Sequence, residues 1–358
     1  MEPFRIHVPD EVLDDLRVRL RRTRWPGQIP GIGWKQGTEL DWLRNLVSYW
    51  SDTFDWRAWE QRLNRLNHFI WDGIHFIYQR ATSGRGMPLV LTHGWPSSFL
   101  DFIEMLPMLE DFDVVIPSLP GYGFSPRPPE VGINYRYVSQ RWHQLMGELG
   151  YSRYGGGAYD FGSGVTTILA LDHPESVIGI YLATLESDLT PAVNDVELSD
   201  IERSYLAVTR RWDETERGYS AIQSTKPQTV GYGLNDSPAG LAAYVGEKWY
   251  SWSDDTPSDD FLCATLTLYW VTQTITSSMR DYWDNRWHPV ERPYIDTPTG
   301  FAVFAHQKVP EGEPPRSYLE RVYNIQRWTV FPRGGHFAPV EEPAALARDL
   351  IAFFRGRN

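Results

Sequence analysis

The chain has 358 residues, a formal net charge of −12 and 22% charged residues, the composition of a globular protein with one elaborated domain or two. The acidic balance and the lack of a basic stripe argue against a nucleic-acid-binding protein. No run of about 18 apolar residues occurs, so we expect no membrane span. The one cysteine permits no disulfide within the chain, and the N-terminus shows no signal-peptide pattern; both features favour a cytoplasmic location.

Residues 1–72 are predicted to form a helical N-terminal region that packs on the domain that follows. A break rich in proline and glycine, residues 26–37, separates the first predicted helix from the next. Apolar residues recur at helical spacing in three stretches, marked by Leu13, Leu16 and Leu20, by Leu43, Val47 and Trp50, and by Trp56, Trp59 and Leu63.

From residue 73 the pattern changes to short apolar runs that alternate with helical stretches, which is typical of a mostly parallel α/β sheet. Residues 195–288 interrupt this alternation. They are helical in pattern and rich in Trp and Tyr, so we expect an inserted helical cap over the strand ends, which divides the core into residues 73–194 and 289–358. The expected strands are Ile74–Tyr78, Pro88–Thr92, Val114–Pro117, Ile178–Ala183, Phe301–Ala305 and Trp328–Phe331.

The chemically most specific stretch is Ala-Tyr-Asp-Phe-Gly-Ser-Gly, residues 158–164. It follows a β-like run that ends near Tyr154 and precedes a helical run, and small residues lie two positions on either side of Asp160. This layout is similar to the sharp strand-to-helix turn that presents the nucleophile of α/β-hydrolases. A carboxylate at its apex forms an alkyl ester when it opens a strained carbon centre. An esterase would need a serine there, and Ser163 lies three residues further on.

Two further motifs supply groups that such a nucleophile needs. His93-Gly-Trp-Pro follows an expected strand, so the Trp95 N–H can point into the site, with the Phe161 N–H as the second donor of an oxyanion hole. Arg333-Gly-Gly-His-Phe follows the last expected strand, which makes His336 the expected general base. No pair of histidines has metal-ligand spacing, so we expect no zinc site. The residues expected to line the substrate pocket are His93, Trp95, Pro96, Tyr159 and Phe161.

Together these segments resemble the microsomal-type epoxide hydrolase family of the α/β-hydrolase superfamily. The resemblance runs nearly end to end and includes Tyr219-Ser-Ala-Ile-Gln-Ser-Thr-Lys-Pro and Asn235-Asp-Ser-Pro-Ala-Gly-Leu in the expected cap. Because five motifs match in order, the combination is far more specific than any one of them. The membrane anchor of some members has no counterpart here, so the chain looks like the soluble bacterial type.

The resemblance implies a mechanism. Asp160 would attack an epoxide carbon and form a glycol ester, while Tyr219 and Tyr282 of the cap would donate hydrogen bonds to the ring oxygen. His336 would then activate water against the ester, and the oxyanion would meet the two N–H groups named above. The product would be a vicinal diol, and no cofactor would be required.

The chain departs from the family pattern at the acid that orients the histidine. The expected position falls on Gln307, and a neutral amide cannot stabilise an imidazolium as a carboxylate does. Glu311 is the favoured substitute because this loop carries a few extra residues. Glu313 and the pair Glu186 and Asp188 are alternatives, and so is the absence of any acid.

The nucleophile turn also departs from the family, which usually has Gly and Trp where this chain has Tyr159 and Phe161. With the aromatic cap, this favours a bulky aromatic epoxide from secondary metabolism as the small-molecule substrate. Two alternatives stay open, a haloalkane or haloacid dehalogenase and a catalytically weak, hydrolase-like binding protein. A homodimer is an option that rests on analogy alone.

Overall fold

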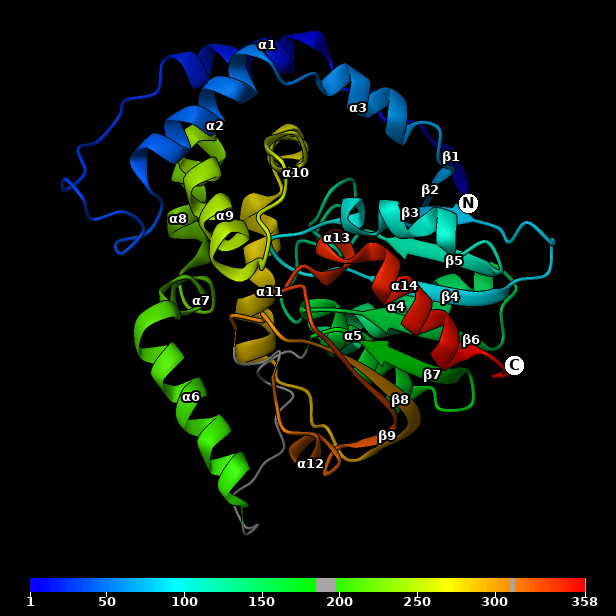
Figure 1. Ribbon diagram of the computed structural model, residues 1–358. Helices are drawn as coiled ribbons and strands as arrows, with labels where there is room; N and C mark the ends of the chain where they lie inside the picture. Colours follow the sequence, from blue (N-terminus) through cyan, green and yellow to red (C-terminus); the bar gives the residue numbers. More distant parts are fainter. Residues whose placement is uncertain (185–197, 310–312, 358) are drawn as a thin grey trace.

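The computed structural model describes residues 1–184, 198–309 and 313–357 (Figure 1). Its strands are β1 (Glu2–Phe4), β2 (His68–Trp71), β3 (Ile74–Gln79), β4 (Met87–Thr92), β5 (Phe112–Pro117), β6 (Tyr154–Ala158), β7 (Val177–Leu182), β8 (Ile295–Phe304) and β9 (Tyr323–Phe331). Within the described residues they form one nine-stranded sheet in the order β1-β2-β3-β5-β4-β6-β7-β8-β9. Strands from β5 to β9 in this order pair in parallel, and β1, β2 and β3 extend the sheet antiparallel. The predicted mostly parallel α/β sheet is confirmed.

The strand before the nucleophile turn differs from the prediction. The β-like run was expected to end near Tyr154, but β6 begins there and continues through three glycines to Ala158. The glycines are required by packing, because a Cβ on Gly155 would lie 2.5 Å from Phe354 and a Cβ on Gly156 would lie 2.7 Å from Thr166. A run of glycines is typical of a loop, so the sequence pattern concealed this closely packed central strand.

Two strands at one end of the sheet, β1 and β2, were also not predicted, because three and four residues are too few to show a reliable alternation. The three expected N-terminal helices are confirmed as α1 (Asp10–Arg21), α2 (Leu40–Asp52) and α3 (Trp56–Leu63). Side chains cap two of them: Glu39 accepts from the Trp42 N–H, and Asp55 accepts from the Arg57 and Ala58 N–H groups.

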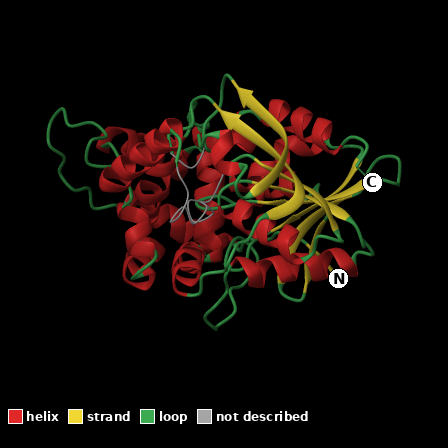
Figure 2. Ribbon diagram, turned by 90° about the horizontal axis from the view of Figure 1, so that it is seen from below, coloured by secondary structure: helices red, strands yellow, loops and turns green. Residues whose placement is uncertain are grey.

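Six helices follow β7 in the described part of the chain and precede β8. They are α6 (Asp200–Glu216), α7 (Gly218–Gln223), α8 (Pro227–Asp236), α9 (Pro238–Trp252), α10 (Asp259–Thr272) and α11 (Ile275–Trp287). Figure 1 shows α1 and α2 arching over α8, α9 and α10, and the Trp50 indole donates to Thr267 Oγ1 at 2.8 Å. Figure 2 shows this helical mass to one side of the sheet. Among the described residues, no helix combines the length and apolar character that a membrane crossing needs.

The remaining helices flank the sheet. They are the 3₁₀ helix η1 (Phe99–Met108), α4 (Tyr135–Glu148), α5 (Phe161–Asp172), α12 (Arg316–Leu319), α13 (Ala338–Glu341) and α14 (Pro343–Phe354). Successive residues of a strand face opposite sides of the sheet. Gly155 faces Phe354 of α14 and Gly156 faces Thr166 of α5, so these two helices cover opposite faces.

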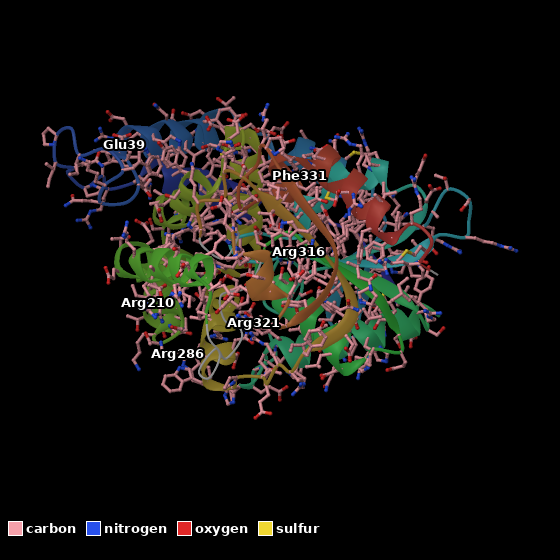
Figure 3. All side chains as sticks on the ribbon, turned by 60° about the horizontal axis from the view of Figure 1, so that its bottom comes forward. Glu39, Arg210, Arg286, Arg316, Arg321 and Phe331 are labelled. Carbon is pink, nitrogen blue, oxygen red and sulfur yellow. The ribbon has the colours of Figure 1, made fainter. Side chains whose placement is uncertain are left out.

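Ion pairs tie the helical insertion to the core. Arg127, with a side chain only 3% exposed, donates to Asp281 at 2.6 Å and to Asp284 at 2.5 Å, both in α11. At the far end of the insertion, Arg321, labelled in Figure 3, pairs with Glu202 of α6 at 3.0 Å. The contacts of Arg127 fix α11, which carries Tyr282, against the loop that follows β5.

We expect Arg127→Met to lower the stability of the protein by about 3–5 kcal/mol at neutral pH, because it leaves two buried carboxylates without their cation. The loss should shrink as the pH falls, since protonation removes the uncompensated charges. Thermal unfolding midpoints between pH 5 and 8 would measure both effects. The matched control is Arg136→Met, because Arg136 and its partner Asp172 are 39% and 22% exposed and their pair should contribute about 1 kcal/mol or less. Equal losses for the two variants would contradict this account.

Candidate active site

Asp160 occupies the sharp turn between β6 and α5. Its backbone has φ 52° and ψ −134°, a conformation that residues with a side chain rarely adopt. The turn is held by hydrogen bonds from the Asp160 N–H to Thr184 Oγ1 at 2.6 Å and from the Ser163 N–H to the Asp160 carbonyl at 2.8 Å. The strained apex that the sequence predicted is therefore present at Asp160.

The two carboxylate oxygens of Asp160 have different partners. Oδ1 accepts from the Trp95 N–H at 2.8 Å and from the Phe161 N–H at 2.7 Å. Oδ2 lies 3.0 Å from Nε2 of His336. The carboxylate also lies at the N-terminus of α5, where the helix dipole favours negative charge. The structure thus brings together the four residues that the motifs predicted for the nucleophile, the base and the two N–H donors.

Two glycines make this close approach feasible. A Cβ on Gly94 would lie 2.1 Å from Asp160 Oδ1, and a Cβ on Gly162 would lie 2.1 Å from the Thr92 carbonyl oxygen. A larger residue at Gly94 would displace the carboxylate from the N–H pair, and one at Gly162 would push α5 away from β4. The small residue that the sequence placed two positions after Asp160 is explained by this contact.

The loop that carries His336 is hydrogen-bonded to the C-terminal end of α9. The His336 N–H donates to the Trp252 carbonyl at 3.0 Å, and the two rings meet edge to face at 4.9 Å. Glu341, which sequence reasoning did not single out, accepts hydrogen bonds from both sides of this junction. Its carboxylate binds the N–H groups of Gly335, Phe337, Asp254 and Asp255 at 3.0, 3.0, 2.7 and 3.3 Å.

The acid that would orient His336 stays a prediction. Nδ1 of His336 is buried and has no hydrogen-bond partner among the described residues. Gln307 is buried, and neither its side-chain oxygen nor its nitrogen has a partner in the described part of the chain. Glu313 is exposed. The other candidates, Glu311, Glu186 and Asp188, lie outside the described residues.

Both predicted tyrosines lie against the residues that hold Asp160. The Tyr219 ring, from α7, stacks on the Trp95 ring with centroids 5.5 Å apart and an interplanar angle of 6°. The Tyr282 ring, from α11, meets Phe161 edge to face at 4.6 Å and Trp95 at 5.7 Å. The two tyrosine rings are 5.8 Å apart. Side chains from two helices of the insertion thus converge on the nucleophile turn.

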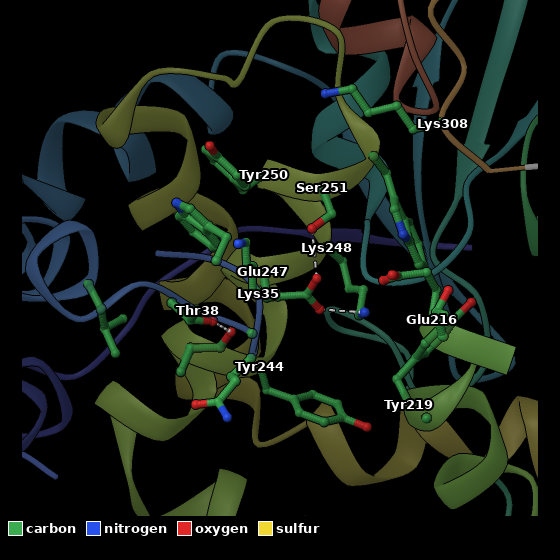
Figure 4. A pocket seen from close by; sticks show the side chains of 18 of the residues that line it. Lys35, Thr38, Glu216, Tyr219, Tyr244, Glu247, Lys248, Tyr250, Ser251 and Lys308 are labelled. Atoms are coloured by element: carbon green, nitrogen blue, oxygen red, sulfur yellow. Dashed lines mark hydrogen bonds and ion pairs between the residues drawn. The ribbon is translucent and has the colours of Figure 1, made fainter. Parts of the chain in front are cut away.

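A cavity of about 1610 Å³ lies between the N-terminal loop, α6 and α9, and it reaches Tyr219 and Trp252 (Figure 4). The five residues expected to line the pocket are buried and do not border this cavity. Tyr159 instead donates its hydroxyl to Asp101, and His93 contacts the Gly94 carbonyl and the Leu119 N–H. Burial lowers the pKa of His93 to about 4, so it supports the turn as a neutral ring.

No cluster of three or more His, Cys, Asp or Glu side chains suited to a metal occurs in residues 1–184, 198–309 and 313–357.

The Asp160–His336 pair on this sheet defines an α/β-hydrolase site. Family models agree: the model for the epoxide hydrolase N terminus matches residues 1–102, and that for the alpha/beta hydrolase fold matches residues 87–294.

Similar proteins show which family of α/β-hydrolases the chain belongs to. Epoxide hydrolase 1 of Sus scrofa is 33% identical over 99% of this chain and 88% of its own length. The structure of Aspergillus niger epoxide hydrolase is 29% identical with a TM-score of 0.88, covering 100% of this chain and 96% of that one. Juvenile hormone epoxide hydrolase of Bombyx mori is 28% identical with a TM-score of 0.89, covering 99% and 94%. The chain belongs to the epoxide hydrolase family and is a hydrolase, as its motifs predicted.

We expect Glu341→Gln to lower kcat for epoxide hydrolysis by up to about 100-fold, because the amide NH₂ cannot accept from all four N–H groups and the His336 loop shifts. Steady-state kinetics with one epoxide would measure this loss, and a thermal midpoint would check folding. Glu342→Gln is the matched control, since Glu342 pairs with Arg333 at 3.4 Å and the arginine is 70% exposed. Similar activity of both variants would refute the role given to Glu341.

Proposed function

We propose that the protein converts an epoxide to a vicinal diol through a covalent ester on Asp160, which water activated by His336 then hydrolyses. The observation that most supports this proposal is that the two Asp160 carboxylate oxygens have different partners. Oδ1 is held by two backbone N–H groups, whereas Oδ2 faces His336. Each half of the reaction uses one of these oxygens.

In the first half-reaction Oδ2 attacks an epoxide carbon. The new C–O bond forms as the ring C–O bond breaks, and the electron pair moves to the ring oxygen. Tyr219 and Tyr282 would donate hydrogen bonds to that oxygen and one of them would supply the proton that makes it a hydroxyl. Donors aimed at developing charge are worth about 3 kcal/mol each. The contacts of both rings with Trp95 support this placement.

In the second half-reaction Oδ1 is the carbonyl oxygen of the ester, and it already accepts from the Trp95 and Phe161 N–H groups. Water attacks the carboxyl carbon while Nε2 of His336 takes its proton. Negative charge develops on Oδ1, where the two donors are in place. The tetrahedral intermediate then breaks its bond to Oδ2, and the diol leaves with that oxygen and a proton returned by His336.

For the substrate we propose a bulky aromatic epoxide. The cavity of about 1610 Å³ exceeds the roughly 300–1,000 Å³ of ordinary ligand pockets. Its walls include Trp252 beside Tyr219 and, further out, the Trp34 and Tyr250 rings, which stack at 3.6 Å. The family relationship favours this reaction over dehalogenation or a binding role, which the sequence had left open.

The covalent step predicts that His336→Gln will accumulate an ester. In a single turnover, the intact protein should gain the mass of one epoxide, and a digest should place the adduct on Asp160. Asp160→Asn should form no adduct and lose at least about 10³-fold in turnover. His306→Gln serves as the control, because His306 is 54% exposed and should retain activity. An Asp160→Asn protein that makes diol at the normal rate would falsify the proposal.

The size of the cavity predicts a preference that kinetics can measure. We expect kcat/KM for a polycyclic aromatic epoxide to exceed that for styrene oxide by about 10-fold or more, because the larger ligand buries more apolar area. Trp34→Ala should reduce this ratio without changing turnover of styrene oxide. A preference for styrene oxide would contradict the substrate assignment and leave the reaction itself untouched.

A further inference from the structure

Lys248 of α9 is a buried cation beside Tyr219. Its side chain is 8% exposed, and its Nζ lies 4.6 Å from the centre of the Tyr219 ring and 5.5 Å from that of Trp252. Figure 4 shows Lys248 and Tyr219 bordering the same cavity. Lysine is almost never this buried unless it is paired, so its position needs an explanation.

Glu247 supplies the partner. Its Oε2 forms an ion pair with Lys248 Nζ, and its Oε1 accepts from Ser251 Oγ at 2.7 Å (Figure 4). Adjacent residues of a helix do not normally face each other, so the two side chains must bend together to form this pair. The pair holds the ammonium group near an aromatic face, where a cation is attracted by the ring electrons.

Other cations in this cavity differ from Lys248. Lys35, Arg211 and Lys308 border it as well, but their side chains are exposed. Water and salt screen exposed charges strongly. Among the described residues that line the cavity, Lys248 is therefore the cation able to act on Tyr219 at short range.

We propose that Lys248, held by Glu247, is a positioning residue that accelerates ring opening by stabilising negative charge on Tyr219. The inference rests on the proposed function. As the ring C–O bond breaks, the Tyr219 hydroxyl gives its proton to the ring oxygen and becomes a phenolate. The ammonium group stabilises that phenolate through the ring and keeps its own protons. After the diol leaves, the phenolate regains its proton through water from the carboxylic acid that ester hydrolysis leaves on Asp160.

Several other titratable groups surround the same ring and can affect its pH dependence. Tyr282 of α11 contacts it directly, and the Asp160–His336 pair lies beyond Trp95 and Trp252. Further titratable side chains that border the cavity are Glu216, Tyr244, Asp254, Asp255 and Lys308. The test therefore compares variants that change one charge of the Glu247–Lys248 pair in a common background, so that the other groups are the same in every variant.

The experiment measures ester formation on Asp160 by rapid quench and mass spectrometry, with styrene oxide in the His336→Gln background. Lys248→Met keeps the apolar stem and should slow ester formation by about 10- to 30-fold. In this variant the alkaline limb of the pH–rate profile, where the rate of ester formation falls at high pH, should move to higher pH. Lys248→Arg should restore most of the rate. Glu247→Gln should move the limb in the opposite direction, to lower pH, because it removes a negative charge from the pair.

Lys308→Met is the matched control and should leave the rate and the limb unchanged. With His336 present, Lys248→Met should not slow hydrolysis of the preformed ester. Equal slowing of both steps, an unmoved limb, or Arg as poor as Met would overturn the inference and indicate packing alone. If Lys248→Met fails to fold, the shift of the alkaline limb in Glu247→Gln still tests whether the charge of the pair affects Tyr219. Absence of any ester in the background protein would instead refute the proposed function.

Discussion

Two backbone N–H groups hold Oδ1 of Asp160, at 2.8 Å from Trp95 and 2.7 Å from Phe161, and the surrounding structure is arranged around this contact. It requires the ends of β4 and β6 to lie side by side, because each N–H follows one of these strands. It requires Gly94, since a Cβ there would overlap the carboxylate. It also requires the strained backbone at φ 52°, which only a well-braced turn can maintain.

Buried polar contacts, rather than apolar packing alone, join the helical insertion to this turn. Arg127 fixes α11 and hence Tyr282, while Glu341 ties the His336 loop to the residues after α9. Such contacts are directional and costly to break. They therefore determine where Tyr282 and His336 lie, whereas the aromatic contacts around Trp95 fill the space between them. We infer that the active site is a property of the core and the insertion together.

The sequence predicted the site residues that belong to local motifs. It did not predict the features that depend on packing between distant parts of the chain. Asp160 and His336 stand in short motifs whose chain order identifies them, and the structure places them 3.0 Å apart. Strand β6 was not predicted because its glycines are required by close contacts with side chains of helices that are distant in the sequence. Glu341 and Lys248 were missed because their importance arises from contacts that no local pattern records.

In the proposed reaction Oδ2 of Asp160 attacks the substrate, and water then attacks the carboxyl carbon. A single turnover in H₂¹⁸O distinguishes this order of attack from direct attack of water on the epoxide. The first diol molecule should carry no label and one ¹⁸O should appear in the peptide containing Asp160, because the diol leaves with an oxygen of the carboxylate. Label in the first diol with an unlabelled Asp160 would show that water attacks the epoxide itself and that no ester forms on Asp160.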